Sequence, residues 1–211
     1  PLVPMFFPIL GAQVSESEFQ YPDLSWKELC GMMGNLVADS GCNKGQLSNI
    51  VEAICHNMRE HDNTELEKLV EWQKQMKTKS ANKEKPARPD VSFWFPPADV
   101  TNAAFIQNAM ACEKLGERTQ YLNLPEVEMA DRMCGGHKQI SQMLRNIYDR
   151  QRSGALRATV EGVTGNPVLR ANLTISSTPY AARKFYKNEL FNGTFGRMMF
   201  SSKARMGRDV R

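Results

Sequence analysis

The sequence predicts an α/β fold with a mainly parallel sheet flanked by helices. Short apolar runs that end at Gly or Pro alternate with stretches in which apolar residues recur every three or four positions. Parallel strands need crossover connections, which are usually helical, so this alternation favours a parallel sheet. One run also leads into a turn of small residues, a lysine and a helical pattern, which is the layout of a phosphate-binding loop.

The first part of the chain is expected to contribute one strand and two helices. The apolar segment 1–12 contains three prolines and is too short to span a bilayer, so we expect it to pack against the core. Residues 36–38 are the first predicted strand. Helical spacing follows over 46–58 and again over 66–76, with a break or helix cap at 62–64 between them.

The middle of the chain begins with a lysine-rich segment. Residues 74–89 have few apolar side chains, which predicts a mobile linker within the domain. The aromatic and β-branched run 91–95 ends at two prolines and is predicted to be a strand. A helix over 101–115, a strand over 120–124 and helical sequence over 127–133 are expected next.

The last third continues the same alternation. We expect a helix over 137–148, strands over 155–161 and 168–176, a helix over 180–190 and a last strand over 197–201. Open parallel sheets bind their ligands beyond the carboxyl ends of the strands. The loop after residues 36–38, Glu126 with Glu128, and Ser177 with Thr178 are therefore expected along one edge of the sheet.

The turn after residues 36–38 is the candidate phosphate-binding loop. In such loops backbone N–H groups cradle phosphates, a lysine reaches the terminal phosphates, and the helix N-terminus favours negative charge. The pattern G-x-x-x-x-G-K-[ST] has glycine where this chain has Ala38 and Asn43, and a magnesium-binding hydroxyl where it has Gly45. An ordinary strand-to-helix turn with an exposed lysine is the alternative. The candidate cofactor-binding residues are Asp39, Ser40, Gly41, Cys42, Asn43, Lys44, Gly45 and Gln46.

Four further residues are candidate catalytic or metal-binding groups. A nucleotide-hydrolysing site needs an acid near the metal, a polar group that orients the attacking water, and an arginine for the developing charge. The chain offers Glu126 with Glu128, then Thr178, then Arg197. The alternatives are structural: solvated charges at a helix N-terminus for the glutamates, a helix cap for the threonine, and pairing with a surface acid for the arginine.

Four segments carry a resemblance to a known family. They are VADSGCNKGQL (37–47), YLNLPEVEMADRM (121–133), ANLTISSTPYAARKFY (171–186) and GTFGRMMFS (193–201). The chain resembles the uncharacterised P-loop ATPase domain, helicase-like, that is found with primase modules in bacterial mobile elements and prophages. The resemblance implies a RecA-like fold, ATP with Mg²⁺, and a role in copying or moving element DNA. It also implies phosphate binding by Lys44, a metal-side acid in Glu126, water activation by Glu128, a sensor in Thr178 and an arginine finger in Arg197.

The charge distribution suggests a partner. From residue 138 to the end, 14 Lys and Arg face 4 Asp and Glu, whereas residues 1–137 carry 13 and 19. A basic C-terminal third can bind DNA or nucleotide phosphates, and a solvated surface balanced by an acidic neighbour is the alternative. Five cysteines without paired spacing predict reduced thiols and a cytoplasmic location. We expect no membrane partner. A homo-oligomer is a possible assembly, and the resemblance implies a neighbouring primase domain as another possible partner.

Length and composition fit one domain over residues 1–211, which the resemblance implies is P-loop NTPase-like, and we expect it to be a piece of a longer protein. The chain is 41% hydrophobic and 24% charged, as in ordinary globular domains. The sequence is compatible with two functions. The first is an ATPase of a mobile-element or phage replication protein, and the second is a catalytically degenerate P-loop module for binding or assembly. A nucleic-acid-binding domain that uses the basic third is a further alternative.

Overall fold

Four parallel strands form the central sheet in the computed structural model. The structure describes residues 2–15, 17–20, 22–23, 25, 28–29, 31–78, 86–116, 118–133, 140–154, 163–187 and 193–203. The strand order is β4-β5-β3-β6, and every neighbouring pair is parallel. The predicted α/β fold with a parallel sheet is confirmed. The strands are β3 (Met33–Ala38), β4 (Gln120–Leu124), β5 (Ala171–Ser177) and β6 (Met199–Lys203).

One face of the sheet is covered by the N-terminal segment and the helix after β3. These elements are η1 (Val3–Phe6), α1 (Phe7–Gln13) and α2 (Gln46–Ile54). Met5, Ile9 and Leu47 are fully or almost fully buried in this layer, together with Tyr121 of β4. The prediction that segment 1–12 packs against the core is therefore confirmed for its described residues. A short antiparallel pair, β1 (Glu18–Phe19) with β2 (Glu28–Leu29), follows α1.

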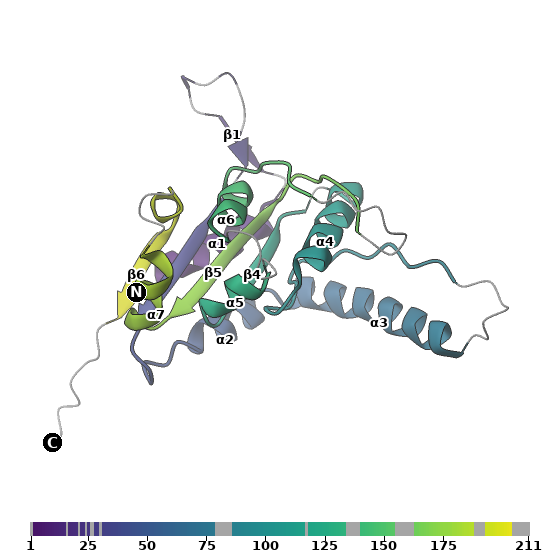
Figure 1. Ribbon diagram of the computed structural model, residues 1–211, viewed down its shortest axis with the longest axis horizontal. Helices are drawn as coiled ribbons and strands as arrows, with labels where there is room; N and C mark the ends of the chain where they lie inside the picture. The colour runs from purple at the N-terminus through teal and green to yellow at the C-terminus, as the bar shows by residue number, and fades with distance from the viewer. Residues whose placement is uncertain are drawn as a thin grey trace.

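The second face carries the larger apolar core, and the helices on both faces are seen in Figure 1. The elements here are α4 (Asn102–Lys114), α5 (Glu128–Met133), α6 (Ile140–Tyr148) and α7 (Pro179–Tyr186). Leu173 and Ile175 of β5 pack in one cluster with Leu144 and Ile147 of α6. All residues of β5 are buried, because this inner strand is covered on both faces.

The order of connections creates a switch point between two neighbouring strands. The chain passes from β3 beyond β5 to β4, returns to β5, and then passes beyond β3 to β6. The helix that follows β3, α2, packs on one face, whereas the helix that follows β5, α7, packs on the other. The loop after β3 and the loop after β5 therefore lead to opposite faces of the sheet from its carboxyl edge. Open parallel sheets bind ligands at such a point.

A long helix, α3 (His56–Thr78), extends well beyond the sheet in Figure 1. The predicted break at 62–64 is wrong, because the helix is continuous there. Asp62 does not cap a helix. Its carboxylate accepts hydrogen bonds from the backbone N–H groups of Trp94 and Phe95, at 2.9 and 2.8 Å. The chain instead bends at Cys55, between α2 and α3.

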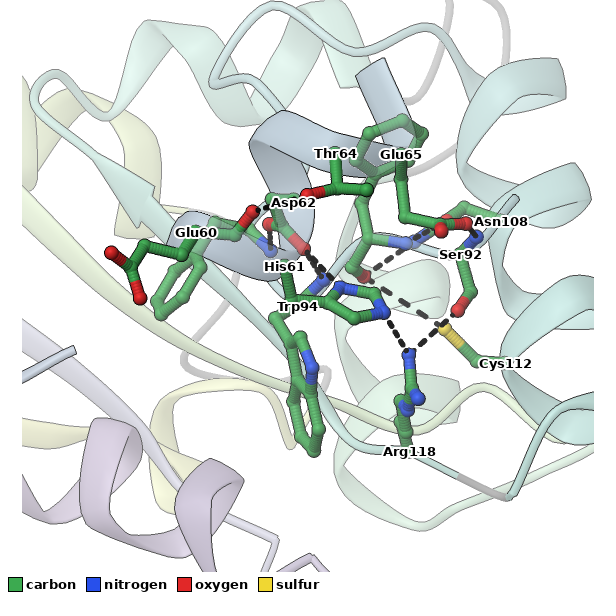
Figure 2. A network of polar contacts seen from close by, with 12 residues as sticks. Glu60, His61, Asp62, Thr64, Glu65, Ser92, Trp94, Asn108, Cys112 and Arg118 are labelled. Carbon is green, nitrogen blue, oxygen red and sulfur yellow. Dashed lines mark hydrogen bonds and ion pairs between the residues drawn. The ribbon is translucent and has the colours of Figure 1, made fainter. Parts of the chain in front are cut away.

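The predicted strand 91–95 is also wrong, because these residues are not part of the sheet and the chain bends at Trp94 and Phe95. A backbone hydrogen bond from Tyr121 to the carbonyl of Trp94, 2.7 Å long, links it to β4. Figure 2 shows that side chains of α3 and α4 surround the segment in place of a second strand. The side chains that accept hydrogen bonds from its N–H groups are Asp62, Glu65 and Asn108.

Other predicted boundaries need smaller corrections or lie outside the described residues. In the predicted linker 74–89, residues 74–78 complete α3, and residues 79–85 are outside the described part. The carbonyl of Pro86 accepts a hydrogen bond from the Trp72 indole at 3.0 Å. The predicted strand 155–161 is outside the described part as well. The last strand begins at Met199, because a 3₁₀ turn, η2 (Phe195–Arg197), occupies the residues before it.

Candidate functional site

The loop after β3 has two residues in the left-handed backbone region. Gly41 has φ of 81° and Asn43 has φ of 58°. Glycine adopts this region at no steric cost, and asparagine is among the few other residues that tolerate it. The N–H of Cys42 donates to the carbonyl of Asp39 at 3.3 Å, which makes a tight turn at the start of the loop.

This loop presents backbone donors at the start of α2. The N–H groups of Gln46 and Leu47 bond to the carbonyls of Asn43 and Lys44. Within the part of the chain that the structure describes, the N–H groups of Gly41, Asn43, Lys44 and Gly45 have no hydrogen-bond partner. Unpaired donors at a helix N-terminus form a site for anions, because the helix dipole adds a positive field there.

Two lysines lie on the loop from different elements. The ammonium of Lys44 donates to the carbonyl of Ala38 at 3.1 Å, so the side chain turns back onto the end of β3. Lys203, the last residue of β6, donates to the carbonyl of Cys42 at 3.3 Å. Both are bonds to neutral carbonyls, which a phosphate can replace with stronger charge-assisted bonds. Lys203 was not among the sequence-predicted residues.

Thr178 lies beside this loop, directly after β5. Its hydroxyl accepts from the N–H of Ala181 at 3.2 Å and so caps α7, as the structural alternative predicted. An accepting hydroxyl still has its own hydrogen to donate, so a cap can also bind a phosphate oxygen. The geometry is therefore compatible with both roles.

A buried polar chain holds the ends of β3 and β5 together beneath the loop. The hydroxyl of Ser177 donates to the side-chain oxygen of Asn35 at 2.8 Å. The amide nitrogen of Asn35 donates in turn to the phenol oxygen of Tyr186 on α7 at 2.9 Å. Asn35 is completely buried, and satisfied polar chains of this kind fix the relative position of the elements they join. Sequence reasoning missed Asn35, although an asparagine in an apolar strand was a visible signal.

The two glutamates follow β4 at the same edge of the sheet. Glu126 precedes α5 and Glu128 is its first residue, and both are exposed. Neither carboxylate has a hydrogen-bond or ion-pair partner among the described residues. Asn123 of β4 donates to the hydroxyl of Ser48 on α2 at 3.0 Å, which links this end of β4 to the helix that follows the loop. Within the described residues, no three His, Cys, Asp or Glu side chains form a group that could hold a metal ion.

Arg197 is separated from the other candidates. It precedes β6, and because β6 is parallel to β3 it lies at the amino edge of the sheet, opposite the loop. Its guanidinium donates two hydrogen bonds to the carboxylate of Asp149, both 2.9 Å long, and a third to the carbonyl of Gly193. The bonds to Asp149 raise the pKa of Arg197. The predicted pairing with a surface acid is therefore observed.

Two cavities adjoin the carboxyl edge. The larger, about 900 Å³, lies between α2, α3, residues 88–101 and α4, and reaches Asn123 and Pro125 at the end of β4. The smaller, about 620 Å³, runs along β6 beside α7, from Phe195 before the strand to Lys203 at its end, where it reaches Asp39 of the loop. The larger cavity does not include a loop residue, whereas the smaller one includes Asp39. Volume alone therefore does not identify which cavity belongs to the candidate loop.

Cys55 and Cys112 are buried, and their thiols are not reactive. Burial raises the pKa of the Cys55 thiol to about 11 and that of Cys112 to about 12. Such thiols stay protonated at neutral pH and are poor nucleophiles, so they are part of the packing.

The comparisons with known proteins give no assignment. A scan against family models, a search of curated proteins and a search of solved structures each find no match for the chain. In the described part, no helix combines the length and the apolar character needed to cross a membrane.

Proposed function

We propose that this chain is an ATP- and Mg²⁺-binding, helicase-like ATPase domain of a mobile-element or phage DNA-replication protein. One observation carries the proposal. The lysine-containing loop, with four unpaired N–H groups at the start of α2, lies at the switch point between β3 and β5, next to Thr178. This is the arrangement that a phosphate-binding loop requires.

The residue roles follow the positions at the edge. Lys44 would bind the terminal phosphates once its ammonium leaves the carbonyl of Ala38. Glu126 would hold Mg²⁺ through water, because the ion usually takes one or two carboxylates together with phosphate oxygens and keeps several waters. Glu128 would activate the attacking water, and Thr178 would donate to the terminal phosphate.

Arg197 fits this scheme only across a subunit interface. Because it lies at the opposite edge of the sheet, its guanidinium cannot reach the terminal phosphate of a nucleotide on the loop of its own chain. An arginine finger supplied by a neighbouring copy would have to leave Asp149 first. Of the two partners that the sequence analysis left open, a homo-oligomer or a neighbouring primase domain, the homo-oligomer is therefore part of the active form that we propose.

A second candidate function is a degenerate P-loop module for binding or assembly. Three observations favour it: Lys44 is turned back onto its own strand, Asn43 places a side chain in the loop, and Gly45 supplies no hydroxyl for magnesium. A module of this kind would keep the fold and the buried chain through Asn35 without nucleotide turnover.

Calorimetric titration with ATP and Mg²⁺ tests the proposal. The Lys44→Ala variant should bind ATP about 30-fold more weakly, because a hydrogen bond to a charged group contributes about 2 kcal/mol. Lys74→Ala, which removes an exposed lysine of α3, is the matched control and should bind like the wild type. Equal affinities of the wild type and Lys44→Ala would refute the phosphate-loop role. No binding by the wild type would favour the degenerate module.

A further inference from the structure

The 620 Å³ cavity beside the loop has an aromatic wall. It lies on the α7 face of the sheet, and Phe195, Phe200 and Tyr186 contribute to its lining. The rings of Phe195 and Phe200 are stacked with centroids 4.6 Å apart, and Tyr186 meets Phe200 edge-on at 5.1 Å. The two phenylalanines are 40% and 39% exposed. Paired aromatic rings that stay open to solvent offer a stacking surface for a flat apolar group.

The rim of this cavity is polar and is shared with the loop. Asp39, the first loop residue, lines the cavity, and so does Lys203, whose ammonium bonds to the loop carbonyl of Cys42. Arg183 of α7 lies on the same rim. The cavity therefore continues directly from the loop and combines one carboxylate with cations near an apolar wall.

The direction of a bound nucleotide follows from the proposed function, on which this inference rests. Thr178 after β5 and Glu126 after β4 would face the terminal phosphate, so that phosphate points from the loop toward β5 and β4. The other end of the molecule must then extend past β3 toward β6. The aromatic cavity lies on that side.

We propose that this cavity holds the nucleoside of a nucleoside triphosphate whose phosphates lie on the loop. The base packs against the outer side of the stacked Phe195–Phe200 pair, and the Asp39 carboxylate accepts a hydrogen bond from the sugar or from an amino group of the base. A volume of about 620 Å³ lies in the range of small-molecule sites and exceeds what a phosphate chain alone needs. The substrate class is therefore a nucleotide and not an inorganic polyphosphate.

Blocking the cavity separates nucleoside binding from phosphate binding. Ser202 is exposed and lines the cavity from β6, so Ser202→Tyr should fill it without disturbing the core. Ser17→Tyr adds the same side chain at an exposed position outside the cavity and is the control. The affinities of ATP and of inorganic tripolyphosphate, each with Mg²⁺, are measured by calorimetry on the full chain.

We expect the wild type to bind ATP at least about tenfold more tightly than tripolyphosphate. Ser202→Tyr should lose that difference and keep its tripolyphosphate affinity, whereas Ser17→Tyr should match the wild type. Phe200→Leu, which keeps an apolar contact but removes the ring, should weaken ATP alone. Equal wild-type affinities for the two ligands, or an unchanged ATP affinity in Ser202→Tyr, would overturn the nucleoside site and leave the phosphate loop standing. If neither ligand binds the wild type, both proposals fail.

Discussion

Replacing Asp62 by asparagine should destabilise the domain far more than an isosteric change on a helix surface normally does. The carboxylate is 8% exposed, and its two oxygens accept separate hydrogen bonds from Trp94 and Phe95, at 2.9 and 2.8 Å. Asparagine keeps one accepting oxygen, but its NH₂ group faces the second N–H. One buried donor is then left unpaired, and the remaining bond loses its charge.

The magnitude follows from these two losses. An unpaired buried donor costs about 1–3 kcal/mol, and a charged bond that becomes neutral loses about 1 kcal/mol. We therefore expect the free energy of unfolding to fall by about 2–4 kcal/mol, which is a large part of the 5–15 kcal/mol typical of a domain.

Urea unfolding at neutral pH, followed by far-UV circular dichroism and tryptophan fluorescence, measures this loss. Asp99→Asn is the matched control, because Asp99 is exposed and has no partner among the described residues. It should lie within about 0.5 kcal/mol of the wild type. If Asp62→Asn also lies within that range, the carboxylate does not hold the segment 91–95, and our explanation of its conformation is wrong.

Three further predictions concern pH, magnesium and DNA. Burial opposes ionisation of Glu65, but hydrogen bonds from Lys68 and from the N–H of Ser92 hold its pKa below the ordinary 4.5. The ionised Glu65 carboxylate therefore stabilises the fold above pH 4.5, and this contribution is lost as the pH falls below that value. The difference in free energy of unfolding between the wild type and Glu65→Gln should accordingly become smaller in acid. Gly45→Ser meets no atom within 4 Å of the added Cβ, so it should fold and tighten ATP binding about fivefold, but only when Mg²⁺ is present. Tightening without Mg²⁺ would contradict this. The exposed cations Arg183 and Lys184 of α7, and Lys187 directly after it, should bind DNA phosphates. Their triple Gln variant should therefore lower the slope of DNA affinity against salt concentration by about two to three units, whereas changing Lys74 and Lys77 of α3 should leave the slope unchanged.

The sequence was sufficient for the buried strands of the sheet and for the loop. β3, β4 and β5 are short apolar runs next to helical patterns, and burial on both faces requires that composition. Residues 91–95 have the same composition but are not a strand. Their neighbours are polar side chains from α3 and α4, and a local pattern does not reveal which distant groups will take the backbone hydrogen bonds.

The candidate site was predictable only where it is local. The loop, Glu126 and Thr178 each follow a strand directly, so parallel pairing brings them to one edge. The contacts of Lys203 with the loop and of Asn35 with Ser177 form only because β6 and β5 are the neighbours of β3. The sequence does not reveal that strand order. Arg197 precedes β6, and because β6 runs parallel to β3, a residue before β6 lies at the amino edge, opposite the loop.

The position of β3 inside the sheet has a consequence for folding. This strand ends at residue 38, but its neighbours β5 and β6 begin at residues 171 and 199, and its Asn35 bonds to Ser177 and Tyr186, 142 and 151 residues away. During synthesis, both edges of β3 therefore stay unpaired until β5 and then β6 have been made. Long-range pairing of this kind is slow, and it exposes an apolar strand to aggregation in the meantime. Removal of β6 should accordingly leave β3 with a permanently open edge on the side that β6 covers.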